Sequence, residues 1–129
     1  MLFLLIYLVN KRVNPTTVRA FFVSAKVHNR WVLGRNIHIP DGFRLPNVSI
    51  DFPSARLYEI AGLNLLEYGK GVRGWLYIFF PGLEREDVRE AKLKIELIDA
   101  FEKKHIIYDE HKALTKGISF YPGAGIKIT

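Results

Sequence analysis

The sequence predicts an all-β fold, an antiparallel β-sandwich, with a small, partly open β-barrel as the alternative. Two observations favour sheets: short runs that alternate apolar and polar residues, and turn residues between those runs. The third is composition, because aromatic residues make up 13% of the 129 residues and only one residue is methionine. Aromatic and β-branched side chains fit a pleated surface better than a helix. We therefore expect about seven to nine short strands and no long helix.

The first strands are predicted by alternation and by turn residues. Residues 18–28 (VRAFFVSAKVH) alternate, so that one face is apolar and packs in the core. After a turn at Asn29-Arg30, residues 31–39 (WVLGRNIHI) form the second candidate, in which Gly34 marks a bulge or a close approach of two backbones. Proline and glycine then predict a turn and two short strands, at residues 40–42, 48–52 and 56–60.

The strongest strand signal is the run at residues 72–80 (VRGWLYIFF), whose two faces are both apolar. Such a strand is central and covered on both sides. Residues 92–97 (KLKIEL) alternate cleanly, with leucine and isoleucine on one face and charged residues on the other. The remaining expected elements are a short charged helix within 83–90, a hairpin connection at 99–104, and strands at 105–108, 118–121 and 126–128.

The N-terminal segment differs in character from the rest. Residues 1–12 form an apolar stub with a basic flank, and residues 13–129 form the predicted sandwich domain. The apolar run is shorter than the roughly 20 residues with which a helix crosses a bilayer. Three interpretations stay open: the end of a transmembrane helix, a buried strand or short helix, and an interfacial anchor. In the first, Lys11 and Arg12 flank the membrane on its cytoplasmic side.

Composition excludes several chemistries and favours one class of partner. The chain has no cysteine, which excludes a disulfide framework, a thiolate metal site and a cysteine nucleophile. The formal net charge is +6. A basic chain favours anionic partners, such as nucleic acid, an acidic protein or an anionic membrane surface.

No motif assigns a catalytic residue, a metal or a cofactor. Residues 69–74 (GKGVRG) have the spacing of a dinucleotide-binding loop, but a β-type run follows where that motif needs a helix. The serines lie in no nucleophile motif. The histidines show no metal-ligand spacing; they are His28, His38, His105 and His111. The chain is therefore expected not to be an enzyme, and a small hydrolase with an unrecognised site is the catalytic alternative.

Four pieces of the chain together carry a resemblance. They are the apolar stub, FFVSAKVHNR at 21–30, GKGVRGWLYIFFPGL at 69–83 and KLKIELIDAFEKKH at 92–105. In this combination the chain resembles the membrane-tethered immunoglobulin-like β-sandwich domains of uncharacterised prokaryotic proteins. The resemblance implies an immunoglobulin-like sandwich and a tether, and no activity. It departs from the pattern at Glu102, where a turn glycine is expected.

The sequence thus predicts a non-catalytic binding or interaction module. The module is expected at the membrane, on the cytoplasmic side, with a soluble cytoplasmic protein as the alternative. A protein partner would contact loops at one end of the sandwich or an edge strand. The predicted contact residues are basic: Arg30, Arg35, Lys70 and Arg73.

The rival function is single-stranded nucleic-acid binding on a small β-barrel. Small barrels of this kind stack bases on exposed aromatic rings beside lysine and arginine. The aromatic candidates are Trp31, Tyr58 and Tyr77, and the basic candidates are Arg30, Arg35, Arg56 and Arg73.

Overall fold

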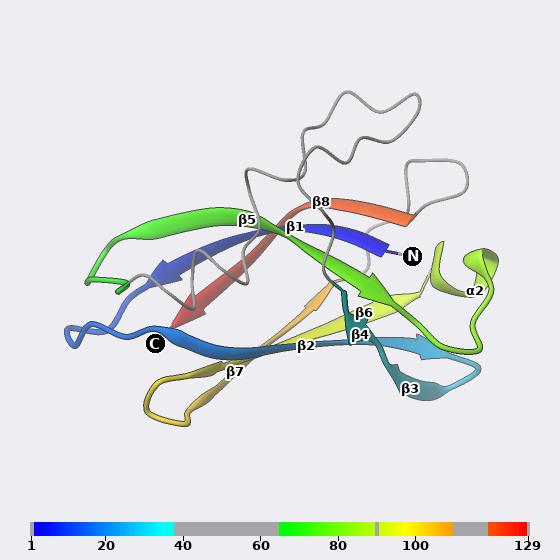
Figure 1. Ribbon diagram of the computed structural model, residues 1–129, viewed down its shortest axis with the longest axis horizontal. Helices are drawn as coiled ribbons and strands as arrows, with labels where there is room; N and C mark the ends of the chain where they lie inside the picture. Colours follow the sequence, from blue (N-terminus) through cyan, green and yellow to red (C-terminus); the bar gives the residue numbers. More distant parts are fainter. Residues whose placement is uncertain (1, 38–64, 90, 110–118, 129) are drawn as a thin grey trace.

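A computed structural model of the chain describes residues 2–37, 65–89, 91–109 and 119–128. These residues form two four-stranded sheets and one short helix, and Figure 1 shows the sheets as two layers. The elements are β1 (Leu2–Asn10), β2 (Val18–Val27), β3 (Arg30–Leu33), β4 (Arg35–Asn36), β5 (Gly71–Phe79), α2 (Arg85–Arg89), β6 (Lys92–Asp99), β7 (Lys104–Asp109) and β8 (Ser119–Ile128). The predicted β-sandwich is confirmed.

The first sheet has the strand order β4-β5-β1-β8. Strands β5 and β1 are antiparallel, whereas β1 and β8 are parallel. The apolar N-terminal run is thus β1, a strand with a partner on each side. Its inward side chains are fully buried: Leu2, Leu4, Ile6 and Leu8.

Of the three interpretations of residues 1–12, the structure shows the buried strand. The alternation of buried leucine and isoleucine in β1 with the exposed side chain of Tyr7 is the period of a strand with one face on the core. No helix in the described part of the chain is long and apolar enough to span a membrane.

The second sheet has the strand order β3-β2-β6-β7, and all its pairs are antiparallel. The inner faces of β2 and β6 follow the predicted alternation, because Phe21, Val23 and Leu93 are buried and their sequence neighbours Phe22 and Lys94 are more exposed. The β2–β3 turn falls at His28 and Asn29, whose φ angles of 50° and 64° match a tight hairpin turn.

Strand β5 confirms the prediction of a strand covered on both sides. It lies between β4 and β1, and its residues from Gly74 to Ile78 are all buried. Gly34 separates β3 from β4 and is the predicted point of close approach. A Cβ atom there would overlap Cγ2 of Ile78 and lie 2.9 Å from Cε1 of Phe80.

The predicted division of residues 118–128 into two strands is wrong. The strands expected at 118–121 and 126–128 are one strand, β8, which continues through Pro122 and Gly123 with a register shift against β1 between Leu4 and Ile6. Both halves of β8 pair with the same strand, β1, so β8 stays one strand despite the turn-forming residues Pro122 and Gly123. The turn and strands expected at 40–42, 48–52 and 56–60 lie outside the described residues.

Candidate functional site

A buried carboxylate organises the turn between β6 and β7. Asp99 is the last residue of β6, and its Oδ1 accepts hydrogen bonds from the backbone N–H groups of Phe101, at 2.9 Å, and Lys103, at 3.0 Å. Aspartate side chains commonly close turns in this way. Glu102 in this turn has φ 64°, the left-handed conformation that favours glycine. Glu102 thus adopts the backbone conformation that glycine would adopt at lower steric cost.

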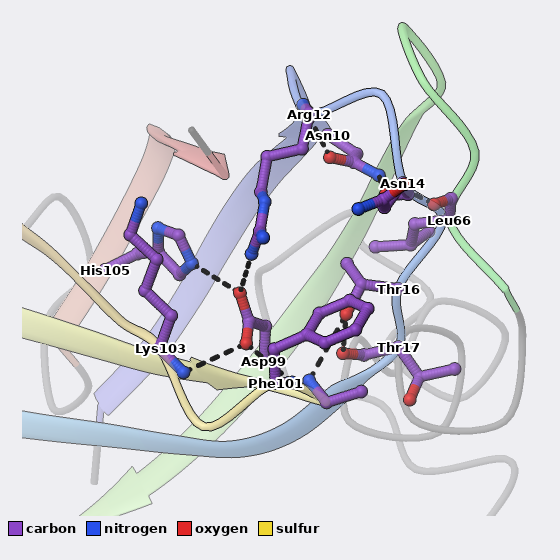
Figure 2. Close-up of polar contacts among 11 residues, drawn as sticks. Asn10, Arg12, Asn14, Thr16, Thr17, Leu66, Asp99, Phe101, Lys103 and His105 are labelled. Carbon is purple, nitrogen blue, oxygen red and sulfur yellow. Dashed lines mark hydrogen bonds and ion pairs between the residues drawn. The ribbon is translucent and has the colours of Figure 1, made fainter.

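The second oxygen of Asp99 contacts two side chains, one from the neighbouring strand β7 and one from the loop that follows β1, as Figure 2 shows. Nε2 of His105 lies 2.9 Å from Oδ2, and Nη1 of Arg12 donates to the same oxygen at 3.2 Å. The side chains of Asp99 and His105 are 0% and 4% exposed, and that of Arg12 is 26% exposed. The Arg12 guanidinium also lies 5.0 Å from the centre of the Phe101 ring.

The surroundings of Asp99 act on its pKa in opposite directions. Burial raises the pKa, because it disfavours the charged carboxylate. The hydrogen bonds from His105 and from the backbone N–H groups of Lys103 and Phe101, together with the charge of His105, lower it. The lowering contributions prevail, so the pKa of Asp99 lies below its ordinary value and the group is ionised at neutral pH.

A neighbouring set of polar contacts holds the connection from β1 to β2. Nδ2 of Asn10 donates to the backbone oxygens of Leu66, at 2.8 Å, and Asn14, at 3.2 Å. Its Oδ1 accepts from the backbone N–H of Arg12 at 2.9 Å. Asn10 is buried, so these bonds satisfy polar groups that burial removes from water. They also fix the backbone from which Arg12 reaches Asp99.

The Asp99–His105 pair has the geometry with which a carboxylate orients an imidazole in general-base catalysis. Both side chains are buried, however. The contacts of Asp99 reach the β6–β7 turn, the loop that follows β1 and strand β7. The pair therefore joins two neighbouring strands of the second sheet, β6 and β7, and Arg12 adds a contact from the loop that follows β1 of the first sheet. Within the described ranges, no three histidine, aspartate and glutamate side chains are grouped so that they could hold a metal ion.

The outer face of the second sheet carries a different set of residues. Here Trp31 in β3 lies opposite Lys26 in β2, Lys26 lies opposite Lys92 in β6, and Lys94 lies opposite Tyr108 in β7. Residues that share a row and a face are in contact range in an antiparallel sheet. We call this surface the lysine–aromatic face; it consists of Phe22, Lys26, Trp31, Leu33, Lys92, Lys94, Glu96, Lys104, Ile106 and Tyr108.

Aromatic rings and ammonium groups are in direct contact on this face. The ring centres of Trp31 and Tyr108 are 6.0 Å apart, with 43° between their planes. Nζ of Lys94 lies 4.9 Å and Nζ of Lys26 5.8 Å from the Trp31 ring centre, and Nζ of Lys92 lies 5.3 Å from that of Tyr108. These distances are those of cation–π contacts.

The charge of the lysine–aromatic face is positive. Its four lysines are accompanied by one acidic residue, Glu96, which lies 3.3 Å from Nζ of Lys94 and 3.6 Å from Nζ of Lys104. Trp31 and Tyr108 are 38% and 56% exposed, and Phe22, Leu33 and Ile106 are exposed as well. Several large apolar side chains that share one face with lysines are typical of a binding surface.

An open groove of about 500 Å³ adjoins Trp31 at the β2–β3 hairpin. Apolar side chains form most of its lining, and His28 and Arg30 supply polar groups. The remaining lining residues are Val27, Trp31, Val32, Leu33 and Leu83. The groove extends the exposed surface from Trp31 to the predicted contact residue Arg30.

The structure does not bring the four predicted contact residues together. Arg30 lies at the groove, Arg35 is exposed in β4, and Arg73 is exposed in β5 opposite Tyr7. Lys70 precedes β5 and lies 4.0 Å from Glu67. Of the two residues predicted to flank a membrane, Lys11 is exposed and Arg12 binds Asp99.

The residues predicted to bind nucleic acid differ in their exposure to solvent. Trp31 is exposed as that hypothesis needs, whereas Tyr77 is 4% exposed and cannot stack on a base. The candidates Tyr58 and Arg56 lie outside the described residues, as do two of the histidines considered for metal binding, His38 and His111. Sequence reasoning missed the lysines beside Trp31 and also Tyr108. The alternation in residues 92–97 already placed Lys92 and Lys94 outward, but only the strand order shows that they lie beside Trp31.

Comparison of the chain with protein-family models, curated proteins and solved structures finds no match. The resemblance to immunoglobulin-like domains of membrane-tethered proteins stays a prediction.

Proposed function

We propose that the chain is a non-catalytic binding module that takes an anionic partner on the lysine–aromatic face. The observation that carries this proposal is the contact of three lysines with two exposed rings: Lys26 and Lys94 with Trp31, and Lys92 with Tyr108. The net charge of +6 supports an anionic partner, because a basic chain attracts anions over distances comparable to the Debye length.

The described residues favour binding over catalysis. The one histidine–carboxylate pair in hydrogen-bond contact among them, His105 with Asp99, is buried. The exposed groups of the lysine–aromatic face are lysines and aromatic or aliphatic side chains, with Glu96 as the acidic residue. Such groups hold a partner by charge and by apolar contact.

The basis of the expected membrane association changes with the fold. That expectation rested on the apolar run of residues 1–9, and residues 2–10 are strand β1, whose inward side chains are fully buried. An anionic membrane remains one partner class that a positive face attracts. Phosphatidylserine vesicles therefore form a separate arm of the binding experiment.

Retention of the chain on immobilised heparin, a soluble polyanion, tests the proposed function. We expect Lys92→Gln and Lys26→Gln to elute at lower salt than the wild type. The matched control is Arg19→Gln, which also removes one positive charge, but from an exposed ion pair with Glu102 outside the face. Equal shifts for all three variants, or no retention of the wild type, would contradict the proposal.

A further inference from the structure

We propose that the anionic partner is a single-stranded nucleic acid whose bases stack on Trp31 and Tyr108. This inference rests on the proposed function, because it specifies the partner of the same lysine–aromatic face. Exposed aromatic rings bind bases of any sequence, since every base has a π-face. Trp31 and Tyr108 offer two such rings at 6.0 Å between centres, on β3 and β7 at opposite edges of the sheet.

The order of side chains across the sheet places aromatic rings and ammonium groups next to one another. A chain that crosses the strands from β3 to β7 meets Trp31, then Lys26, then Lys92 and Lys94, then Tyr108. Each nucleotide presents one base and one phosphate. The two rings, with centres 6.0 Å apart, supply adjoining surfaces for bases, and the ammonium groups beside them supply partners for phosphates.

The positions of the ammonium groups match this use. Lys26, Lys94 and Lys92 each lie between 4.9 and 5.8 Å from a ring centre. A base that stacks on the ring therefore brings its own phosphate within reach of a lysine on a flexible stem. The groove beside Trp31 also has Arg30 in its lining, on the same hairpin.

Two features favour a single strand over other anionic partners. Protein–protein interfaces are depleted in lysine, and this face has four lysines. A duplex presents the same phosphate charge, but its bases are stacked on one another and offer no free faces. A partner that used only the charges would leave Trp31 and Tyr108 exposed to water.

The experiment is a titration of the full chain with fluorescently labelled oligo(dT) and oligo(rU), followed by anisotropy at two salt concentrations. We expect Trp31→Ala to weaken binding by about 5- to 150-fold, the effect of losing one stacked base. Tyr108→Ala is expected to act in the same direction. The matched control is Tyr68→Ala, which removes an exposed tyrosine outside the face and is expected to leave the affinity unchanged.

A spectroscopic readout separates stacking from charge. The chain has two tryptophans, and Trp75 is 6% exposed. In a Trp75→Phe variant, the remaining emission comes from Trp31, and stacking of a base is expected to quench it. Lys92→Gln is expected to lower the slope of log K against log salt by about 0.7, the contribution of one phosphate contact to a single strand. Far-UV circular dichroism of each variant verifies its fold.

Duplex DNA of equal length, heparin and phosphatidylserine vesicles form the comparison arms. Single-strand binding that exceeds duplex binding and depends on Trp31 supports the inference. Equal binding of single strand, duplex and heparin, with Trp31→Ala unchanged and Lys92→Gln weakened, would overturn the inference while the proposed function stands. Preference for the vesicles would also overturn it. Absence of binding to every polyanion would remove both proposals.

Discussion

Nε2 of His105 lies 2.9 Å from Oδ2 of Asp99, and both side chains are buried. Nη1 of Arg12 shares the same oxygen at 3.2 Å. One carboxylate thereby connects three segments: the end of β6, strand β7 and the loop that follows β1. Arg12 follows β1 of the first sheet, and Asp99 ends β6 of the second. Their contact therefore links the two layers at one end of the sandwich.

Asp99→Asn is expected to destabilise the fold by about 3 kcal/mol, because removing one partner of a buried pair leaves the other groups uncompensated. The amide oxygen of asparagine can still accept from the turn N–H groups, so the loss reports on Arg12 and His105. Chemical denaturation measures it. Asp87→Asn, at a helix and partly exposed, serves as the control and is expected to change stability far less. Equal effects of the two substitutions would show that the buried network adds nothing.

The lowered pKa of Asp99 predicts the direction of a pH effect. In the window between the folded and unfolded pKa values, the unfolded state binds more protons, so stability rises with pH there. The contribution of ionised Asp99 to the free energy of unfolding is complete above the unfolded pKa of about 3.9. It is lost as pH falls through the pKa of Asp99 in the folded state. The difference in unfolding free energy between wild type and Asp99→Asn should therefore shrink below about pH 4. A difference that is constant with pH would refute this assignment.

Gly34→Ala is expected to cost about 1–3 kcal/mol, the usual effect of overpacking a core. The added Cβ meets Ile78 and Phe80, which are both buried and cannot move aside. Gly71→Ala is the matched control: its Cβ would lie 2.5 Å from Oη of Tyr7, which is exposed and can rotate away. Thermal unfolding should show a loss for the first variant and a shift of at most about 0.5 kcal/mol for the second.

Glu102→Gly is expected to be more stable than Glu102→Ala by about 1 kcal/mol. Both variants remove the exposed ion pair with Arg19, so their difference isolates the backbone. Residue 102 has φ 64°, a conformation that glycine adopts without the steric cost of a Cβ. Denaturant midpoints of the two variants measure the difference. An alanine variant as stable as the glycine variant would mean that the turn relaxes.

Leu4→Ala is expected to cost about 2–5 kcal/mol, because it leaves a cavity under a fully buried side chain of β1. Tyr7→Ala, on the exposed face of the same strand, is expected to cost less than about 1 kcal/mol. If both substitutions left the free energy of unfolding nearly unchanged, the side chains of β1 would not contribute to the core. Calorimetric unfolding of the two variants decides this.

Local pattern predicted most of the second sheet. The alternation in residues 18–28 and 92–97 identified β2 and β6 with the correct inner faces, because one face of each strand packs on the core. The role of residues 1–9 stayed open for a physical reason. Residues 1–9 are apolar almost throughout, so their sequence lacks the alternation of apolar and polar residues that identifies a strand. Length and flanking charges could not distinguish such a run from the end of a helix.

The candidate sites needed the tertiary structure. Asp99, Arg12 and His105 meet through strand order and a loop path, which no spacing in the sequence reveals. The lysine–aromatic face was partly visible, since Trp31 was a candidate and Lys92 was predicted to face outward. Their proximity depends on the β3-β2-β6-β7 order, which sequence patterns leave undetermined.

The position of β1 sets an order of events during folding. β1 is paired with β5 and β8, which the ribosome makes after it, while β2 with β3 and β6 with β7 are neighbouring hairpins. Local hairpins form faster than pairings between distant segments, whose loop-closure entropy is larger. Strand β1 is thus made before both of its neighbours, and it waits longer for them than the hairpin strands wait for theirs. In a nascent chain its leucines would be a natural target for chaperones that shield apolar segments.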